Sequence, residues 1–411
     1  MAVLLNELFF PKYDPHTASL LAAFALCSSL AFRPIGALIF GWIGDNIGRK
    51  PTIIITTVMM AASCLVMANL PTYAQIGISA AWILTICRIV QGISSMGEAV
   101  GAEIYLTESI ERPARYPAVA LVDVSSASGD LFALGVAYFV TSSGLNWRIV
   151  FWLGASIAIV SAFARTRLRE TPAFLEMKRK ELKKDIEEIN LELDPVRGEV
   201  LNKYWKERIN KKTVASYFFI ACGWPLCMYT AYFYFNPILK ESFGYSTEDI
   251  IKHNFFLALI AVISNIFVAY LSYHTHPLKI NKIRAILILP LMLSLPFLTM
   301  NLTSPVQLFL IQAFILTFPL RDMPAASIFI EHLPFYLRFT FASFLFAIAR
   351  ALIYITTSFG LIYLGSYFGH FGLCVITLPT TLAFLYGIFH FQGLERELDL
   401  VHKRISESKP I

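Results

Sequence analysis

Charged residues are scarce in this sequence. Asp, Glu, Lys and Arg make up 15% of its 411 residues, whereas about 25% is usual for a soluble globular protein. Hydrophobic residues reach 56% and are spread over the whole length. This composition excludes a water-soluble domain with one anchor, and it predicts an all-α membrane protein that crosses the bilayer many times.

Motifs of common enzymes and metal sites are also lacking. The chain has no phosphate-cradling GxxxxGK[ST], no nucleophile elbow and no HExxH. Its six cysteines lie in apolar stretches, and no pair fits a zinc motif, which favours small core residues over a disulfide framework. We therefore expect no enzyme activity, no catalytic residue, no metal and no cofactor.

What is present instead is a series of long apolar stretches. About 20 such residues are needed to span the hydrocarbon core, and by that measure the sequence predicts about eleven transmembrane helices. They lie at about 18–40, 51–70, 77–107, 118–141, 148–166, 214–239, 250–273, 283–300, 305–331, 338–365 and 371–392.

Lys and Arg are distributed unevenly among the connecting loops. One set of loops carries them, for example at Arg49 with Lys50 and at Arg338, whereas the alternate set, such as 69–71 and 301–303, is nearly bare. The positive-inside rule places the basic set in the cytoplasm. The alternation along the whole chain supports the multi-pass interpretation.

The charged stretch 167–213 divides the chain. We expect an N-terminal helical bundle at 1–166, a cytoplasmic charged linker at 167–213, a C-terminal six-helix bundle at 214–392 and a cytoplasmic tail at 393–411. Charges of both signs at helical spacing between 176 and 192 favour a solvated helix in the linker. Eleven crossings with a cytoplasmic tail would start the chain outside without a signal, so a first helix is expected to be missing or cut short.

Several short motifs together resemble one transporter family. The stretch from Gly41 to Lys50 resembles the loop between helices two and three of the major facilitator superfamily. Three further stretches resemble the metabolite–proton symporter branch in particular. They are Arg33-Pro34-Ile-Gly36, the run from Arg88 to Ala102, and Glu170-Thr171-Pro172-Ala-Phe174. Further matches are Asp123 with Gly129, Trp147 with Arg148, and Glu331 to Pro334 with Arg338.

The resemblance implies a major facilitator fold with two helical bundles. It further implies proton-coupled symport of a small organic solute, either a proline/betaine-type compatible solute or a small carboxylate, across the bacterial inner membrane. The expected partners are the solute, a proton and the lipid bilayer, with no nucleic acid, and the expected state is a monomer. A transport-inactive homologue, a transporter-like sensor or scaffold, and an uncoupled facilitator remain alternatives.

Charges inside apolar spans are candidate functional groups, because each costs about 2.5–3.5 kcal/mol at a helix centre. Arg88 and Glu98 lie in the fourth family helix, and Asp123 and Asp130 lie seven residues apart on one face of the fifth. We expect these four residues to serve proton coupling or gating. The structural alternative is a set of ion pairs, with Glu98 bound to Arg88 or another helix and Asp123 to Arg115 or Arg88.

Two arginines and two tyrosines are candidates for binding the solute. Arg350 and Arg321 fall inside late spans, where a guanidinium can hold a carboxylate with two hydrogen bonds. Tyr229 and Tyr232 lie in an aromatic-rich stretch that would suit an ammonium group. The alternatives are that Arg321 neutralises a neighbouring acid, and that the tyrosines belong to an interfacial aromatic belt.

Gly41, Gly44, Asp45, Gly48 and Arg49 form the cytoplasmic gate motif that the resemblance implies. In the family this loop holds the inner side closed in the outward-open state. Physically, an acid is stabilised near a helix N-terminus, and Gly44 and Gly48 would permit a tight turn. The alternative is an ordinary basic turn on the cytoplasmic side.

Overall fold

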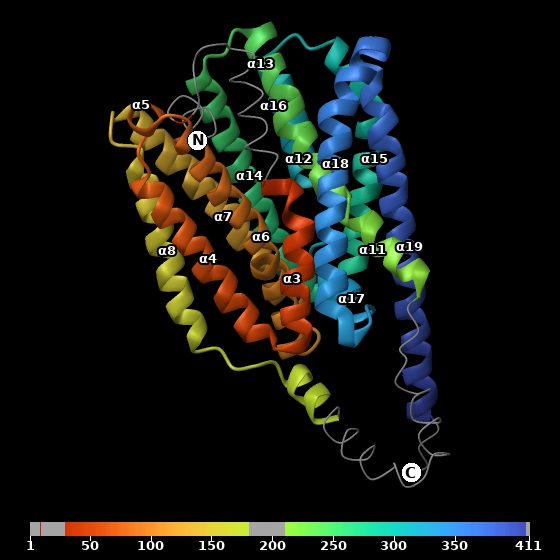
Figure 1. Cartoon of the computed structure of the whole chain (residues 1–411). Helices are drawn as coiled ribbons and strands as arrows, with labels where there is room; N and C mark the ends of the chain where they lie inside the picture. The colour runs from red at the N-terminus through yellow and green to blue at the C-terminus, as the bar shows by residue number, and fades with distance from the viewer. Residues whose placement is uncertain (1–8, 10–28, 181–209, 408–411) are drawn as a thin grey trace.

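The computed structural model describes residue 9, residues 29–180 and residues 210–407. Within these ranges every regular element is helical, and Figure 1 shows the long helices running side by side. Nine described helices are long and apolar enough to cross a membrane, and Pro305–Thr317 is a shorter apolar helix. The predicted all-α class is confirmed. The count of eleven spans stays a prediction, since the first expected span lies partly outside the described residues.

The helices before residue 167 form the part that we call the first half. They are α3 (Arg33–Asn46), α4 (Arg49–Asn69), the one-turn α5 (Tyr73–Ile76), α6 (Ile78–Ser109), α7 (Arg115–Ser142) and α8 (Arg148–Thr166). Long helices suit these apolar sequences because lipid offers no hydrogen-bond partners to an irregular backbone. α4 packs against both α6 and α8, and α3 packs against α6.

The helices after residue 210 form the second half. They are α11 (Lys211–Ala221), α12 (Gly223–Met228), the π-helical η1 (Tyr229–Tyr234), α13 (Phe235–Phe243), α14 (Thr247–His274), α15 (Pro277–Met300), α16 (Pro305–Thr317), α17 (Ala326–Glu331), η2 (Phe335–Leu337), α18 (Arg338–Phe368), η3 (Gly369–Phe371) and α19 (Gly372–Glu407). Gly244, with φ 66°, ends α13, and the side chains of Ser246 and Asp249 cap the start of α14.

Two pairs of helices join the halves. α3 lies along α18, and α7 lies along α14; Figure 1 shows α3 next to α18 at the centre of the molecule. Gly41 and Gly44 face α18, where a Cβ atom would collide with Thr340 or with the ring of Phe339. The two glycines therefore permit the close approach of helices from opposite halves.

The expectation of a loop beginning at Gly41 is wrong. α3 continues to Asn46, because the Ile43 carbonyl still accepts the N–H groups of Ile47 (2.8 Å) and Gly48 (3.1 Å). Only Gly48, with φ 146°, provides the turn before α4. Gly44 is helical and serves packing, so its predicted role in a tight turn is corrected.

The expected span 305–331 is interrupted. α16 ends at Thr317 and α17 begins at Ala326, leaving an irregular segment that we call the 318–325 break. Pro319 and Pro324 explain it, because proline removes a backbone donor and disfavours a helical residue before it.

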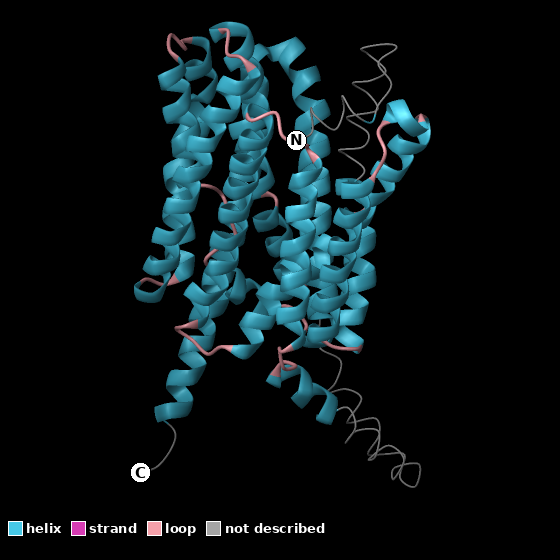
Figure 2. Cartoon of the chain, turned by 90° about the vertical axis from the view of Figure 1, so that its left-hand side faces the viewer, coloured by secondary structure: helices cyan, strands magenta, loops and turns pink. Residues whose placement is uncertain are grey.

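The C-terminal helix is longer than expected. α19 continues to Glu407, well past the predicted end of the last span, and Figure 2 shows it projecting below the bundle towards the C-terminus. In the charged stretch, residues 172–180 are helical, and Lys180 pairs with Glu176 at 2.8 Å. The helix expected as far as 192 lies mostly outside the described residues.

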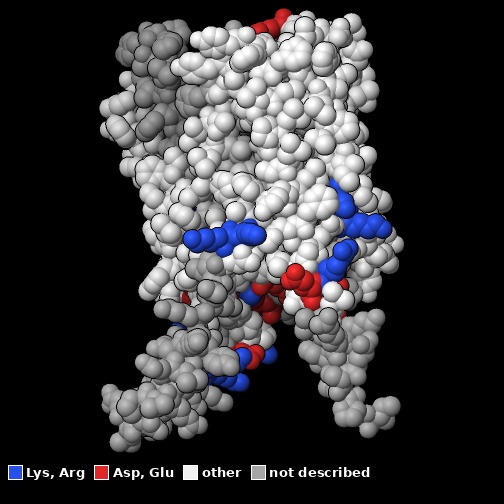
Figure 3. All heavy atoms as spheres, turned by 90° about the vertical axis from the view of Figure 1, so that its right-hand side faces the viewer, with Lys and Arg blue, Asp and Glu red and all other residues white. Residues whose placement is uncertain are grey.

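Charge is asymmetric on the surface. Figure 3 shows one side of the molecule, with Lys and Arg gathered in its lower part and an upper part almost without charge. Cytoplasmic loops of membrane proteins carry such an excess of Lys and Arg. We therefore orient the end that holds α17 and the C-terminus towards the cytoplasm.

Candidate functional site

A group of buried charges lies where the two halves meet. We call Glu103, Asp123, Arg284, Arg321, Asp322 and Arg350 the central charge cluster, since each acts electrostatically on others of the set. They come from α6, α7, α15, α18 and the 318–325 break. Burying charges within the membrane is costly, whereas apolar residues in the same places would carry no such cost. Charges that are kept despite this cost are therefore candidates for function.

Asp123 and Arg321 form an ion pair across the two halves, and both are buried. The Arg321 guanidinium also lies over the Trp224 ring, 4.0 Å from its centroid. The structure thus pairs Asp123 with Arg321, and not with the Arg115 or Arg88 that the sequence suggested as structural partners. For Arg321 this is the alternative in which it neutralises a neighbouring acid, and the functional roles of both residues stay predictions.

The 318–325 break is held by side chains from neighbouring helices. The Leu320 N–H donates to Cys227 Sγ at 3.4 Å, Asn281 donates to the Asp322 carbonyl at 2.9 Å, and Arg284 donates to the Met323 carbonyl at 3.2 Å. Irregular backbone at membrane depth requires such partners. Sequence reasoning missed Asp322 and Arg284 as site residues, although two prolines flanking Arg321 and Asp322 were a usable signal.

Arg350 has no acid bound to it. Its guanidinium lies over Phe346, 3.9 Å from the ring centroid, its Nε atom is buried without a hydrogen bond, and no ion pair forms in the described part of the chain. The positive charge of Arg33 on α3 acts on that of Arg350, and the Arg33 Nε atom is likewise buried without a partner among the described residues. Two such arginines form a site that can accept an anion.

Glu103 was missed by sequence reasoning. It lies on α6 with 6% of its surface exposed, and its Oε2 atom has no hydrogen-bond partner. A rotation of about 100° per residue puts Glu103 and Glu98 about 140° apart around the helix. The sequence signal that could have pointed to Glu103 was therefore an acidic residue on a different face of α6 from Glu98.

Glu98 lies apart from the cluster. Arg165 on α8 donates to it at 2.7 Å and also hydrogen-bonds Thr57 on α4, so Glu98 is part of an ion pair within the first half. This is the alternative in which Glu98 pairs with another helix. Arg88 makes no hydrogen bond or ion pair among the described residues, and the structure does not bring it to Glu98.

Asp130, Tyr232 and Tyr229 lie beyond the cluster towards the outer side. Asp130 is exposed and acts on Tyr232 and Arg321, which places it between the halves. Tyr229 stacks on Phe233 with ring centroids 5.7 Å apart. Both tyrosines lie in the π-helical η1, a distortion that often occurs at functional sites.

Asp45 joins the two halves at their cytoplasmic end. Its carboxylate accepts the backbone N–H groups of Phe339 (3.0 Å) and Thr340 (2.9 Å) and the Thr340 hydroxyl (2.8 Å), all at the start of α18. A negative charge is stabilised at this position by the helix dipole and the free N–H groups. The acid of the motif thus holds a helix of the opposite half.

Arg49 connects the motif to α6. It is fully buried and pairs with Asp45 (3.3 Å) and Glu108 (3.1 Å), and Glu108 also pairs with Arg338 (3.4 Å) of the second half. Arg49 therefore reaches the second half through two acids, Asp45 and Glu108. Behind it, Glu170 accepts the N–H of Arg49 at 3.1 Å and caps α4.

A second group of ion pairs lies at the cytoplasmic end of the bundle, around Glu331, which belongs to none of the candidate membrane spans. Glu331 accepts hydrogen bonds from both Arg112 and Arg115, and Arg112 also pairs with Glu395 at 2.7 Å. Burial opposes the charged form of Glu331, but the two arginines outweigh it and hold the pKa of Glu331 below its ordinary value. We call these four residues with Asp45, Arg49, Glu108 and Arg338 the cytoplasmic gate.

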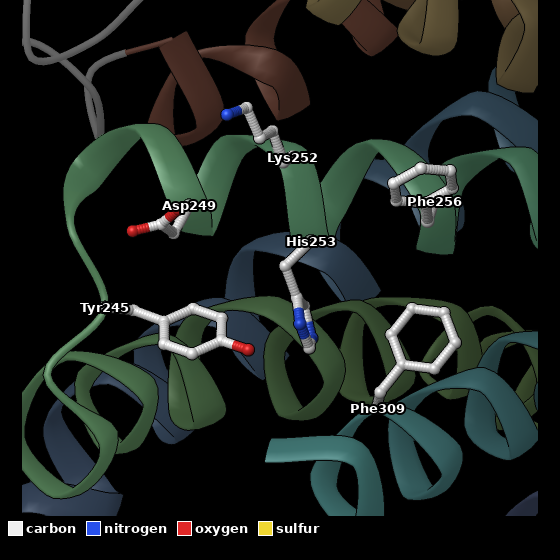
Figure 4. A pocket seen from close by; sticks show the side chains of 6 residues that line it. All are labelled: Tyr245, Asp249, Lys252, His253, Phe256 and Phe309. Atoms are coloured by element: carbon white, nitrogen blue, oxygen red, sulfur yellow. The ribbon is translucent and has the colours of Figure 1, made fainter.

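A separate pocket of about 500 Å³ opens at the outer end of α14. Figure 4 shows the rings of Tyr245, His253 and Phe309 together, with Lys252 pointing away from them. His253 Nε2 lies 2.7 Å from Gln312 Oε1, so its polar atom has a partner within the protein. In the described residues, no group of His, Cys, Asp or Glu could hold a metal ion.

Comparison with protein families and curated proteins identifies relatives. The family model described as Major Facilitator Superfamily matches residues 8–334. The proline/betaine transporter of Salmonella typhimurium is 33% identical over 181 residues, and that of Escherichia coli (strain K12) is 31% identical over 213 residues. These matches cover 42% and 50% of this chain but 36% and 43% of the relatives, so the chain spans less than half the length of each.

Comparison with solved structures identifies a similar fold. The proton:xylose symporter XylE, bound to 6-bromo-6-deoxy-D-glucose, superposes with a TM-score of 0.76 over 94% of this chain and 89% of that chain. Sequence identity is 18%, so the likeness concerns the fold. The relatives and this structural neighbour are transporters and not enzymes.

Proposed function

This chain belongs to the Major Facilitator Superfamily, and from that premise we propose that it is a proton-coupled secondary transporter of a small organic solute. The family and the major facilitator fold predicted from the sequence are confirmed. The solute we propose is a proline/betaine-type compatible solute or a small carboxylate. The proposed setting is the bacterial inner membrane, with the chain acting as a monomer.

The observation that carries this proposal is the pair Arg33 and Arg350. They come from opposite halves, act on each other as like charges, and have no bound acid in the described part of the chain. Buried charges without a counter-ion are unfavourable, and an anion between these two arginines would compensate both of them. A solute carboxylate held there would contact both halves at once, which is what alternating access requires.

The outer part of the site suits the positive end of a zwitterion. Asp130 and Tyr232 act on each other beyond Arg350, and an acid with an aromatic ring can stabilise an ammonium group. Curated relatives carry the name proline/betaine transporter, and both of those solutes have a carboxylate and a positively charged nitrogen. We propose that Arg350 and Arg33 orient the solute, with Tyr229 and Tyr232 bordering it, while Arg321 stays paired with Asp123.

Alternating access would use the cytoplasmic gate. We propose that 1–166 and 214–392 move as two bundles, joined by the linker 167–213 and followed by the tail 393–411. Breaking the contacts of Asp45 with α18 and of Arg112 with Glu331 and Glu395 would open the inner side. Gly41, Gly44 and Gly48 would let the halves close again, and Arg49 would hold Asp45 in place.

Uptake into proteoliposomes tests this function. The purified chain would be reconstituted and offered labelled proline, betaine, citrate or α-ketoglutarate, with and without a pH gradient that is acidic outside. We expect the gradient to drive accumulation of at least one solute, and betaine to be preferred over choline, which lacks the carboxylate. Equal uptake under both conditions would indicate a facilitator, and no uptake would indicate an inactive homologue or a sensor.

Two arginine variants sharpen this test. Arg350→Gln should reduce uptake about 100-fold, because a charged hydrogen-bond partner of the solute is lost, while Arg350→Lys should retain part of it. Arg179→Gln removes an exposed arginine near the linker and should leave uptake unchanged. Normal uptake by Arg350→Gln would contradict the proposed binding site.

A further inference from the structure

Glu103 is the one acid of the central charge cluster that has neither an ion pair nor a hydrogen bond to its side chain among the described residues. It is 6% exposed, and its Oε2 atom is buried without a partner. Its backbone is ordinary helix, with Thr107 donating to its carbonyl at 2.7 Å. An isolated buried carboxylate is unfavourable, whereas the neutral carboxylic acid is tolerated.

The charges around Glu103 come from every side. Asp123 on α7, Asp322 and Arg321 on the 318–325 break, and Arg350 on α18 act on it directly, as Glu103 itself does on Tyr217 of α11. The helices α3, α4 and α17 also pack on α6. α3 contributes Asp45, α4 contributes Arg49 and α17 contributes Glu331, and all three residues are bound in the cytoplasmic gate. Arg33 acts on Arg350.

Among the described residues, Glu103 and Arg350 are the acid and the cation of the cluster whose side chains have neither an ion pair nor a hydrogen bond. Arg321 is taken by Asp123, and Arg284 donates to the Met323 carbonyl. Asp322 accepts the Met323 N–H at 3.1 Å. Arg350 has no ion pair in the described part of the chain, and both Asp322 and Glu103 attract its charge, so it is the cation available to a deprotonated Glu103.

We propose that Glu103 carries the transported proton and that Arg350 is shared between the Glu103 carboxylate and the carboxylate of the solute. With the proton on Glu103, Arg350 is free to hold the solute. When the proton leaves, Arg350 turns to Glu103 and the solute is released. The proton moves on and off one carboxyl group, and no other bond changes. This inference rests on the proposed symport function.

The arrangement makes a thermodynamic prediction. Because proton and solute each favour the state in which Arg350 is free of Glu103, each must strengthen the binding of the other by the same factor. Solute affinity should therefore fall as pH rises. The expected change is about 5- to 150-fold, the usual range of coupling between two sites.

Glu103→Gln tests the proposal, because glutamine imitates the protonated acid. Accumulation driven by the pH gradient should be lost, while exchange of labelled for unlabelled solute continues, and solute affinity should no longer depend on pH. Glu103→Asp should keep some gradient-driven accumulation. Glu241→Gln, which removes an exposed carboxylate at the outer side, is the matched control and should behave like the unchanged chain.

The outcomes separate this inference from the proposed function. If the unchanged chain shows no gradient-driven uptake of any solute, symport itself fails. If it does, and Glu103→Gln still accumulates solute while Glu98→Gln does not, Glu98 carries the proton and the inference about Glu103 is overturned.

Infrared spectroscopy provides a test that needs no solute. The purified full chain at neutral pH should show the C=O band of a protonated carboxylic acid, and Glu103→Gln should lose it. Gel filtration would show whether the Glu103→Gln variant is folded, by elution like that of the unchanged chain. If the folded variant retained the whole band, this would contradict a proton on Glu103. Glu103→Asp, which should shift the band without removing it, guards against a general loss of structure.

Discussion

The central charge cluster and the cytoplasmic gate are both built from acids and arginines at the contact between the halves, yet they differ in how their charges are paired. In the gate, the acids Asp45, Glu108 and Glu331 each bind at least one donor of the opposite half. In the cluster, the side chains of Glu103 and Arg350 have neither an ion pair nor a hydrogen bond among the described residues. A paired set holds a state, whereas an unpaired acid and base are available to a proton and a solute.

The largest expected effect comes from breaking the one complete ion pair of the cluster. Asp123→Ala should lower the free energy of unfolding by about 3–5 kcal/mol, because Arg321 is left as an uncompensated buried charge. Thermal unfolding of the purified protein in detergent measures it. Adding Arg321→Met to Asp123→Ala should recover more than half of the loss.

A matched control for that pair lies on the surface. Glu248 pairs with Lys252 at 3.0 Å, with both side chains exposed, and Glu248→Ala should leave the unfolding temperature unchanged because exposed pairs are screened by water. An equal loss in both variants would mean that the buried pair has no special importance.

An intermediate effect is expected from loosening the gate. Asp45→Asn removes the charge at the start of α18 and should weaken the closed state by about 1–2 kcal/mol. A cysteine placed at Ser343, buried one turn further along α18, should then react faster with a thiol reagent added from the cytoplasmic side of oriented vesicles. Unchanged labelling would show that Asp45 does not hold the gate closed.

The smallest expected effect is the change with pH in the stability that the cytoplasmic gate provides. Because the pKa of Glu331 is held below its ordinary value, its stabilisation is complete above that ordinary value and is lost only as pH falls through the lowered one. We expect a loss of no more than about 1 kcal/mol, since the group is partly exposed. Unfolding temperature measured against pH should be flat near neutrality and fall in acid.

Glu331→Gln sharpens the comparison of gate and cluster. It should weaken that acid dependence and leave the pH dependence of solute binding unaltered, since the latter is assigned to Glu103. If solute binding by Glu331→Gln no longer depended on pH, the cytoplasmic gate and the central charge cluster would titrate together.

The sequence motifs predicted the family correctly, but they identified only some of the charged residues that are buried where the two halves meet. Asp45 was expected near a helix N-terminus, and hydrogen bonds place it at the start of α18. Asp123 and Arg321 were separate candidates, because a linear sequence does not state that positions 198 apart meet. Glu98 matched the family motif, yet it pairs with Arg165 within the first half, and Glu103 was assigned no role because it belongs to no motif.

The sequence by itself determined that this chain is an α-helical membrane protein of the Major Facilitator Superfamily, because apolar length, loop charge and local motifs are properties of neighbouring residues. Only the tertiary structure decided which buried charges neutralise one another. Pairing depends on which helix faces meet across the two halves, and neither the 318–325 break nor the crossing of α3 with α18 follows from local pattern. The unpaired Glu103 and Arg350 are therefore visible only in the folded molecule.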